Sequence, residues 1–123
     1  MTARTPAEVH HRFAESVAAK DLDALVDLYE PDAVMVPEPG RIIQGQEGIR
    51  KNLQELLATN PRLESETTAV VRAGEIAMLR ARWSIIGTAP NGSAVHYSGE
   101  STEIVRMQAD GTWKCVIDNP YST

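Results

Sequence analysis

The first twenty residues have the hydrophobic spacing of an amphipathic helix. Val9, Phe13 and Val17 recur at intervals of four, which places them on one side of a helix of about four turns. Thr5 precedes a proline and is followed three residues later by Glu8, the pattern of a capping box at a helix start. This stretch therefore predicts a helix that buries one apolar stripe.

Two more helices and a short hairpin are expected before residue 60. Asp21 caps a second, shorter helix, which ends at Pro31 because proline disfavours helical geometry in the residue before it. Residues 33–36 and 41–45 read as two short strands joined by a turn. A third helix is expected from Gln46 to about residue 58, with an apolar face of isoleucine and leucine.

After residue 61 the pattern changes to the two-residue alternation of β-strands. Glycine-containing turns separate four such segments, at residues 62–73, 76–88, 94–108 and 112–118. The predicted fold class is α+β, with three N-terminal helices packed on a strongly curved antiparallel sheet. Because long strands twist and curl, we expect a cone-shaped barrel with an internal pocket at its open end.

Composition and charge narrow the possible functions. The chain has 123 residues with 42% hydrophobic and 24% charged residues, which predicts a single globular domain over residues 1–123. A net charge of −5 disfavours nucleic-acid binding, and no apolar run approaches the roughly 20 residues that cross a membrane. The start of the chain lacks the apolar segment of a signal peptide, and Cys115 is a lone cysteine. We therefore expect a cytoplasmic protein.

Neither a metal nor a cofactor is expected. His10 and His11 are adjacent on a helix and point about 100° apart, so they cannot chelate one ion together. His96 stands alone, and the sequence contains no cysteine–histidine cluster. The turn at residues 37–40 lacks the glycine spacing of a phosphate-binding loop.

Several segments resemble the nuclear transport factor 2-like superfamily, and more narrowly its SnoaL-like and ketosteroid-isomerase-like branch. They are DLYEPDAV, the run Gly45–Arg50, RARWSIIG and TEIVRMQADGTWKCVIDNP. The resemblance implies a cone-shaped fold and a homodimer formed through the outer face of the sheet. The superfamily includes isomerases, cyclases, hydrolases, dehydratases and non-catalytic ligand binders, so the fold alone does not choose a function.

The resemblance also suggests site residues. The general base of the steroid isomerases falls on Pro37, which cannot accept a proton, and the first helix lacks the tyrosine of their oxyanion hole. The second acid of those isomerases falls near Glu103, and the aspartate of the SnoaL-like cyclases matches Asp118. Other readings stay open: Asp118 could only tie down the turn into Pro120, and Glu103 could be solvated or paired with an arginine.

Two functions follow from these residues. The first is a cofactor-free enzyme, of isomerase, cyclase or hydrolase type, that acts on a small hydrophobic molecule with Asp118 as base or water activator and Glu103 as acid or second carboxylate. The alternative is a non-catalytic binding or accessory protein with the same cavity. In both cases the expected ligand-binding residues are Tyr29, Met35, Trp83, His96 and Tyr97, and core packing is the alternative role of the aromatic ones.

Overall fold

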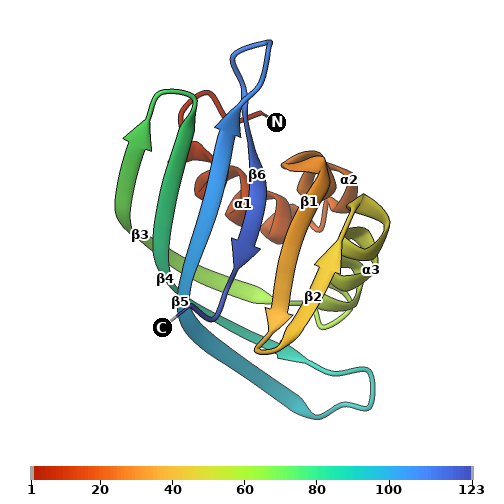
Figure 1. The fold of residues 1–123 in the computed structure, drawn as a ribbon. Helices are drawn as coiled ribbons and strands as arrows, with labels where there is room; N and C mark the ends of the chain where they lie inside the picture. The colour runs from red at the N-terminus through yellow and green to blue at the C-terminus, as the bar shows by residue number, and fades with distance from the viewer. Residues whose placement is uncertain (1, 123) are drawn as a thin grey trace.

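The computed structural model describes residues 2–122 and contains helices packed on one curved sheet (Figure 1). The helices are α1 (Glu8–Ala19), α2 (Leu22–Asp27) and α3 (Gln46–Leu57). The strands are β1 (Tyr29–Glu38), β2 (Arg41–Gln44), β3 (Arg62–Ala73), β4 (Ile76–Thr88), β5 (Ala94–Met107) and β6 (Trp113–Asn119). The third helix and the four long strands match their predicted bounds to within one residue.

The sheet is mixed and open. Its strand order is β2-β1-β6-β5-β4-β3, and β3 to β6 form the expected antiparallel meander. β1 adds to this meander parallel to β6, and β2 pairs with β1 as an antiparallel hairpin. β2 and β3 form the two edges, so the sheet curves strongly but does not close. The predicted α+β fold, with helices packed on a strongly curved sheet, is confirmed. The sheet differs from the expected antiparallel one in the parallel pairing of β1 with β6, because alternation along a short strand does not reveal its partner.

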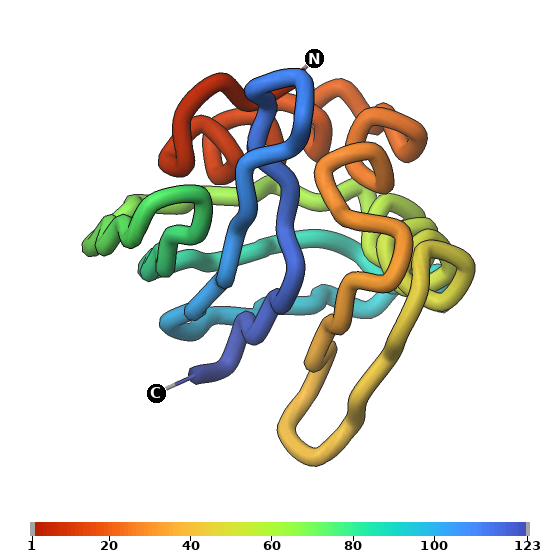
Figure 2. The backbone as a smooth tube through the Cα atoms, turned by 45° about the horizontal axis from the view of Figure 1, so that its top comes forward, coloured from red at the N-terminus to blue at the C-terminus, as the bar shows by residue number. Residues whose placement is uncertain are grey.

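The helices cover one face of the sheet (Figure 2). α1 packs against β3 and β6, while α3 packs against β1 and β2. Only α1 and α2 precede the first strand, since α3 follows the β1–β2 hairpin. Residues of α1 and α3 line a cavity together with residues of the sheet.

The predicted helix ends are partly confirmed. Asp21 caps α2, since its side chain accepts a hydrogen bond from the Ala24 N–H at 3.1 Å. The predicted capping box is wrong: α1 begins at Glu8 after a turn, and the Glu8 carboxylate accepts from the Arg4 N–H instead. α2 ends at Asp27, earlier than Pro31, because the chain then joins β6 as β1.

The hydrophobic core lies between the helices and the concave face. Leu25, Ile49, Leu79 and Val105 are completely buried, and Trp113 closes the core beside the N-terminal segment. Each such side chain contributes roughly 1.5–3 kcal/mol by leaving water. Within residues 2–122, no helix is long and apolar enough to span a membrane.

Candidate functional site

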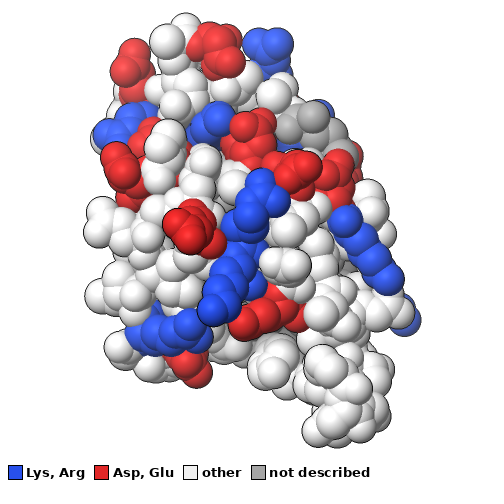
Figure 3. All heavy atoms as spheres, turned by 90° about the vertical axis from the view of Figure 1, so that its right-hand side faces the viewer, with Lys and Arg blue, Asp and Glu red and all other residues white. Residues whose placement is uncertain are grey.

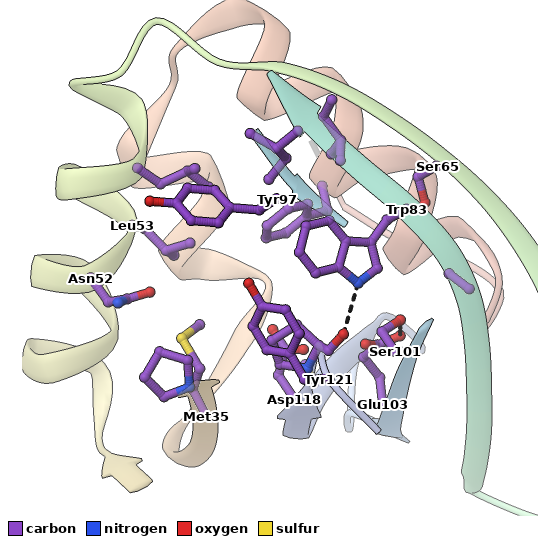
Figure 4. A pocket seen from close by; sticks show the side chains of 18 of the residues that line it. Met35, Asn52, Leu53, Ser65, Trp83, Tyr97, Ser101, Glu103, Asp118 and Tyr121 are labelled. Carbon is purple, nitrogen blue, oxygen red and sulfur yellow. Dashed lines mark hydrogen bonds between the residues drawn. The ribbon is translucent and has the colours of Figure 1, made fainter. Parts of the chain in front are cut away.

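A cavity of about 390 Å³ lies between the helices and the curled sheet (Figure 4). Its walls are mainly apolar and aromatic, and include Phe13, Met35, Leu53, Trp83, Tyr97 and Tyr121. Two carboxyl groups, Glu103 and Asp118, form part of the lining together with Tyr29 and His10. A small apolar cavity with a few convergent polar groups is the usual form of a small-molecule site.

Glu103 and Asp118 face each other on neighbouring strands. They are directly paired in the register of β5 and β6, and residues opposite each other in an antiparallel pair share a face of the sheet. Glu103 lies on the same face of β5 as the buried residues Ser101 and Val105, and its side chain is only 7% exposed. The two carboxyl groups are therefore brought together by backbone pairing.

A β-bulge turns Asp118 toward the cavity. Both Cys115 and Asp118 line the cavity, although strict alternation would point residues three apart in opposite directions. Val105 of β5 pairs with Cys115 of β6, but the next residue, Ile104, pairs with Ile117. Val116 is therefore an extra residue on β6 that has no partner on β5. Ile117 is consequently exposed on the outer face and Asp118 faces inward.

Tyr29 holds the Asp118 carboxyl. Its hydroxyl donates a hydrogen bond to Asp118 Oδ2 at 2.6 Å (oxygen to oxygen), and the side chain is buried at the start of β1. Tyr29 pairs in parallel with Cys115, which also lines the cavity. A tyrosine from β1 thus contacts the carboxyl pair.

His10 and Ser101 hold the Glu103 carboxyl. Ser101 Oγ donates to Glu103 Oε1 at 3.1 Å, and His10 Nε2 contacts the same oxygen. The other ring nitrogen, His10 Nδ1, lies 2.8 Å from the hydroxyl oxygen of Thr67 on β3. The Glu103 carboxyl also lies within hydrogen-bonding reach of the Asp118 carboxyl.

The buried pair favours retention of a proton on Asp118. Burial, first, and the nearby charge of Glu103, second, raise the pKa of Asp118 from 3.8 to about 8, against the opposing effect of the hydrogen bond from Tyr29. Burial, followed by the charge of Asp118, also raises the pKa of Tyr29 well above its usual value, so its hydroxyl stays protonated. The floor of the cavity therefore carries a protonated carboxylic acid beside a second carboxyl group near neutral pH.

Comparison with known proteins establishes the family. The family model of the SnoaL-like domain matches residues 10–116, nearly the whole chain. The chain belongs to the SnoaL-like family. No curated protein matches it significantly. The match confirms the resemblance to the SnoaL-like branch.

Solved structures with the same fold include three similar proteins. A conserved protein from Planctomyces limnophilus is 22% identical, with a TM-score of 0.81 over 92% of this chain and 89% of that chain. A ketosteroid isomerase-like protein from Erwinia carotovora is 18% identical, with a TM-score of 0.78 over the same shares, 92% and 89%. A nuclear transport factor 2-like superfamily protein from Salmonella enterica is 17% identical, with a TM-score of 0.79 over 94% and 88%. These identities support the fold of the SnoaL-like domain and not its activity.

The other expected ligand-binding residues of this SnoaL-like domain lie on two different faces of the sheet. Met35, Trp83 and Tyr97 line the cavity. His96 lies outside it: the side chain is exposed and paired with Ile86 on the opposite face of β5, because neighbouring residues of a strand alternate. The placement of His96 in the cavity was therefore wrong.

Trp83 also contacts the segment after β6. Its indole N–H donates to the carbonyl oxygen of Pro120 at 2.8 Å, and its ring meets Tyr121 edge to face with 5.4 Å between ring centroids. Gly99 makes room for this contact, since an added Cβ would lie 3.1 Å from the Pro120 oxygen. Pro120 and Tyr121 therefore form part of the cavity wall.

Pro37 and Asn52 also line the cavity. Pro37, the position suggested for the isomerase base, lines the cavity without offering a proton acceptor. Asn52 projects inward from α3 (Figure 4).

Acidic and basic side chains are interspersed on the side of the molecule that bears α3 and β2 (Figure 3). Within residues 2–122, no group of three or more His, Cys, Asp and Glu side chains could hold a metal ion.

Proposed function

We propose that this SnoaL-like domain is a cofactor-free acid–base enzyme that acts on a small hydrophobic molecule. The observation that carries the proposal is the pairing of Glu103 and Asp118 at the floor of an apolar cavity. Two carboxyl groups in one partly dry site favour different protonation states, so that one can donate a proton while the other accepts one.

The surroundings of the pair favour particular roles. Asp118, whose pKa is raised to about 8, is the proton donor near neutral pH. Glu103 Oε1 accepts a hydrogen bond from Ser101 and contacts His10 Nε2, which favours Glu103 as the proton acceptor of the pair. These roles are the reverse of those suggested by the sequence, where Asp118 was the base and Glu103 the acid.

The proposed step is a proton transfer next to a carbonyl group. Glu103 takes a proton from the carbon beside the carbonyl, the electron pair of that C–H bond moves to form the enol double bond, and Asp118 gives its proton to the carbonyl oxygen. The Tyr29 hydroxyl, which donates to Asp118 Oδ2, stabilises the carboxylate that remains. Return of a proton to the same or another carbon, with reprotonation of Asp118, restores the pair.

Proton exchange in deuterium oxide tests this function without knowledge of the natural substrate. A panel of small cyclic ketones is incubated with the wild-type protein, and deuterium at the carbon beside the carbonyl is measured by mass spectrometry. We expect enzyme-dependent exchange that Asp118→Asn and Glu103→Gln each reduce by about 10²–10⁴-fold. Asp32→Asn is the matched control because Asp32 is an exposed carboxylate on β1.

The same experiment distinguishes the second candidate, a ligand-binding protein. Pro37 at the position of the isomerase base favours that candidate, because the cavity then lacks one expected proton acceptor. Ketones that bind, as measured by calorimetry, but exchange no faster with wild type than with Asp118→Asn would support binding without chemistry and contradict the enzymatic proposal.

We further propose a homodimer formed through the outer face of the sheet. An apolar row crosses this face in cross-strand register, from β3 to β1: Val71, Met78, Ile104, Ile117 and Val34. Val71 and Ile117 at this row are 57% and 41% exposed. On the same face, Arg82 of β4 is paired in register with Glu66 of β3 and Glu100 of β5. Because a symmetric dimer brings the same surface of two copies together, each copy presents both positive and negative side chains to the other.

Sedimentation equilibrium tests the dimer. We expect wild type to have the mass of two chains and Ile117→Glu to have the mass of one, because the substitution places a charge within the apolar row. Val70→Glu is the control, since Val70 is similarly exposed but paired with the inward-facing Leu79. A monomeric wild type, or an unchanged mass for Ile117→Glu, would contradict the proposed interface.

A further inference from the structure

Thr67 and His10 form a chain of contacts that ends at Glu103. His10 belongs to α1, Thr67 to β3 and Glu103 to β5, so the chain links a helix to two non-adjacent strands. Thr67 is paired with the buried Ala81, which fixes its side chain on the inner face of the sheet. The register of β3 shifts immediately after it, between Thr67 and Ala69.

The hydrogen-bonding capacity of each group restricts where the imidazole hydrogen lies. An ionised carboxylate only accepts hydrogen bonds, so His10 Nε2 must carry a hydrogen when Glu103 is ionised. In a neutral imidazole the other nitrogen, Nδ1, is then an acceptor. Thr67 Oγ1, 2.8 Å from Nδ1, is the hydroxyl that can donate to it.

We propose that Thr67 is a positioning residue whose hydroxyl donates to His10 Nδ1, which keeps the single imidazole hydrogen on Nε2 facing Glu103 and thereby fixes Glu103 as the proton acceptor of the carboxyl pair. This inference rests on the proposed function for the roles of the pair. It adds the orienting group that distinguishes acceptor from donor. The arrangement resembles other sites in which the partner of one ring nitrogen determines the state of the other.

Without this hydroxyl, two properties of the site change. The Nδ1 acceptor loses its partner, and the ring is free to rotate away from the orientation that directs Nε2 at Glu103 Oε1. Glu103 then keeps only the hydrogen bond from Ser101 on that oxygen. The acceptor oxygen of Glu103 is then less firmly oriented, and proton transfer from the ligand to Glu103 slows.

Nitrogen-15 NMR of the histidine side chains tests the inference without any ligand. We expect the wild-type His10 ring to carry hydrogen on Nε2 and to accept a hydrogen bond at Nδ1. In Thr67→Val the Nδ1 resonance should shift to that of a free acceptor, and in Thr67→Ser it should return to the wild-type position. Thr68→Val is the control because Thr68 is the exposed next residue on β3. Hydrogen on Nδ1 in the wild type, as the other tautomer or as imidazolium, would overturn the proposal.

Ketone exchange supplies the kinetic readout. We expect Thr67→Val to lower the turnover rate at least tenfold with little effect on the Michaelis constant, and Thr67→Ser to restore it. Equal rates for wild type and Thr67→Val would overturn the positioning role even if the proposed function holds. If no variant or wild type shows exchange, the proposed function fails, while the NMR result still decides the orientation of His10.

Discussion

Replacement of Asp118 by asparagine should remove a pH-dependent loss of stability. The pKa of Asp118 is raised from 3.8 to about 8 in the folded protein, so the folded state holds a proton that the unfolded chain has lost. Wherever the folded state binds more protons, stability falls as pH rises. This contribution is therefore fully present below about pH 4 and is lost as pH rises toward 8. Asparagine has the shape of the protonated acid and does not titrate.

The size of the effect follows from the difference in pKa. Roughly four pKa units at 1.36 kcal/mol each give an upper limit of about 6 kcal/mol between pH 4 and pH 8. Asp118 borders an open cavity, where solvent reduces the cost of the charge. About half of that limit, roughly 3 kcal/mol, is therefore the expected difference.

Urea denaturation at several pH values, followed by tryptophan fluorescence, measures this effect. We expect the free energy of unfolding of wild type to fall between pH 5 and pH 8 relative to that of Asp118→Asn. The exposed-carboxylate variant Asp32→Asn should follow the wild-type curve. Parallel pH dependences for wild type and Asp118→Asn would refute the claim that Asp118 retains its proton in the folded protein.

Two more substitutions test the contacts around the site. Tyr29→Phe removes the hydrogen bond that lowers the pKa of Asp118, so the midpoint of the pH-dependent stability loss should move upward; a downward shift in the same denaturation series would contradict the assigned contact. Trp83→Phe removes the bond to the Pro120 carbonyl and should destabilise the protein by about 1–2 kcal/mol, with faster hydrogen exchange at the Ser122 amide, which donates to Glu100. An unchanged exchange rate at Ser122 would show that Trp83 does not hold this segment.

The sequence predicted the secondary structure well because its signals are local. The alternation in the four long segments and the glycine turns between them depend only on near neighbours. The pairing of β1 with β6 was not predicted, since it joins residues such as Tyr29 and Cys115 that are far apart along the chain. The open, mixed sheet follows from that long-range pairing.

The candidate site was predicted in part for the same reason. Glu103 and Asp118 were selected by family resemblance, but alternation left the direction of Asp118 open because Val116 forms a bulge that no local pattern reveals. His10 was considered only as a metal ligand. Its spacing of i, i+3 and i+7 with Phe13 and Val17 was an available signal that it lies beside the buried stripe of the first helix.

The central claim is that the carboxyl pair at the cavity floor holds one proton near neutral pH and uses it for catalysis. Carbon-13 NMR of the side-chain carboxyl groups, titrated from pH 4 to pH 9, tests this claim most directly. We predict that the Asp118 resonance moves with a midpoint near 8. An Asp118 resonance that is already fully ionised at pH 6 would contradict the account.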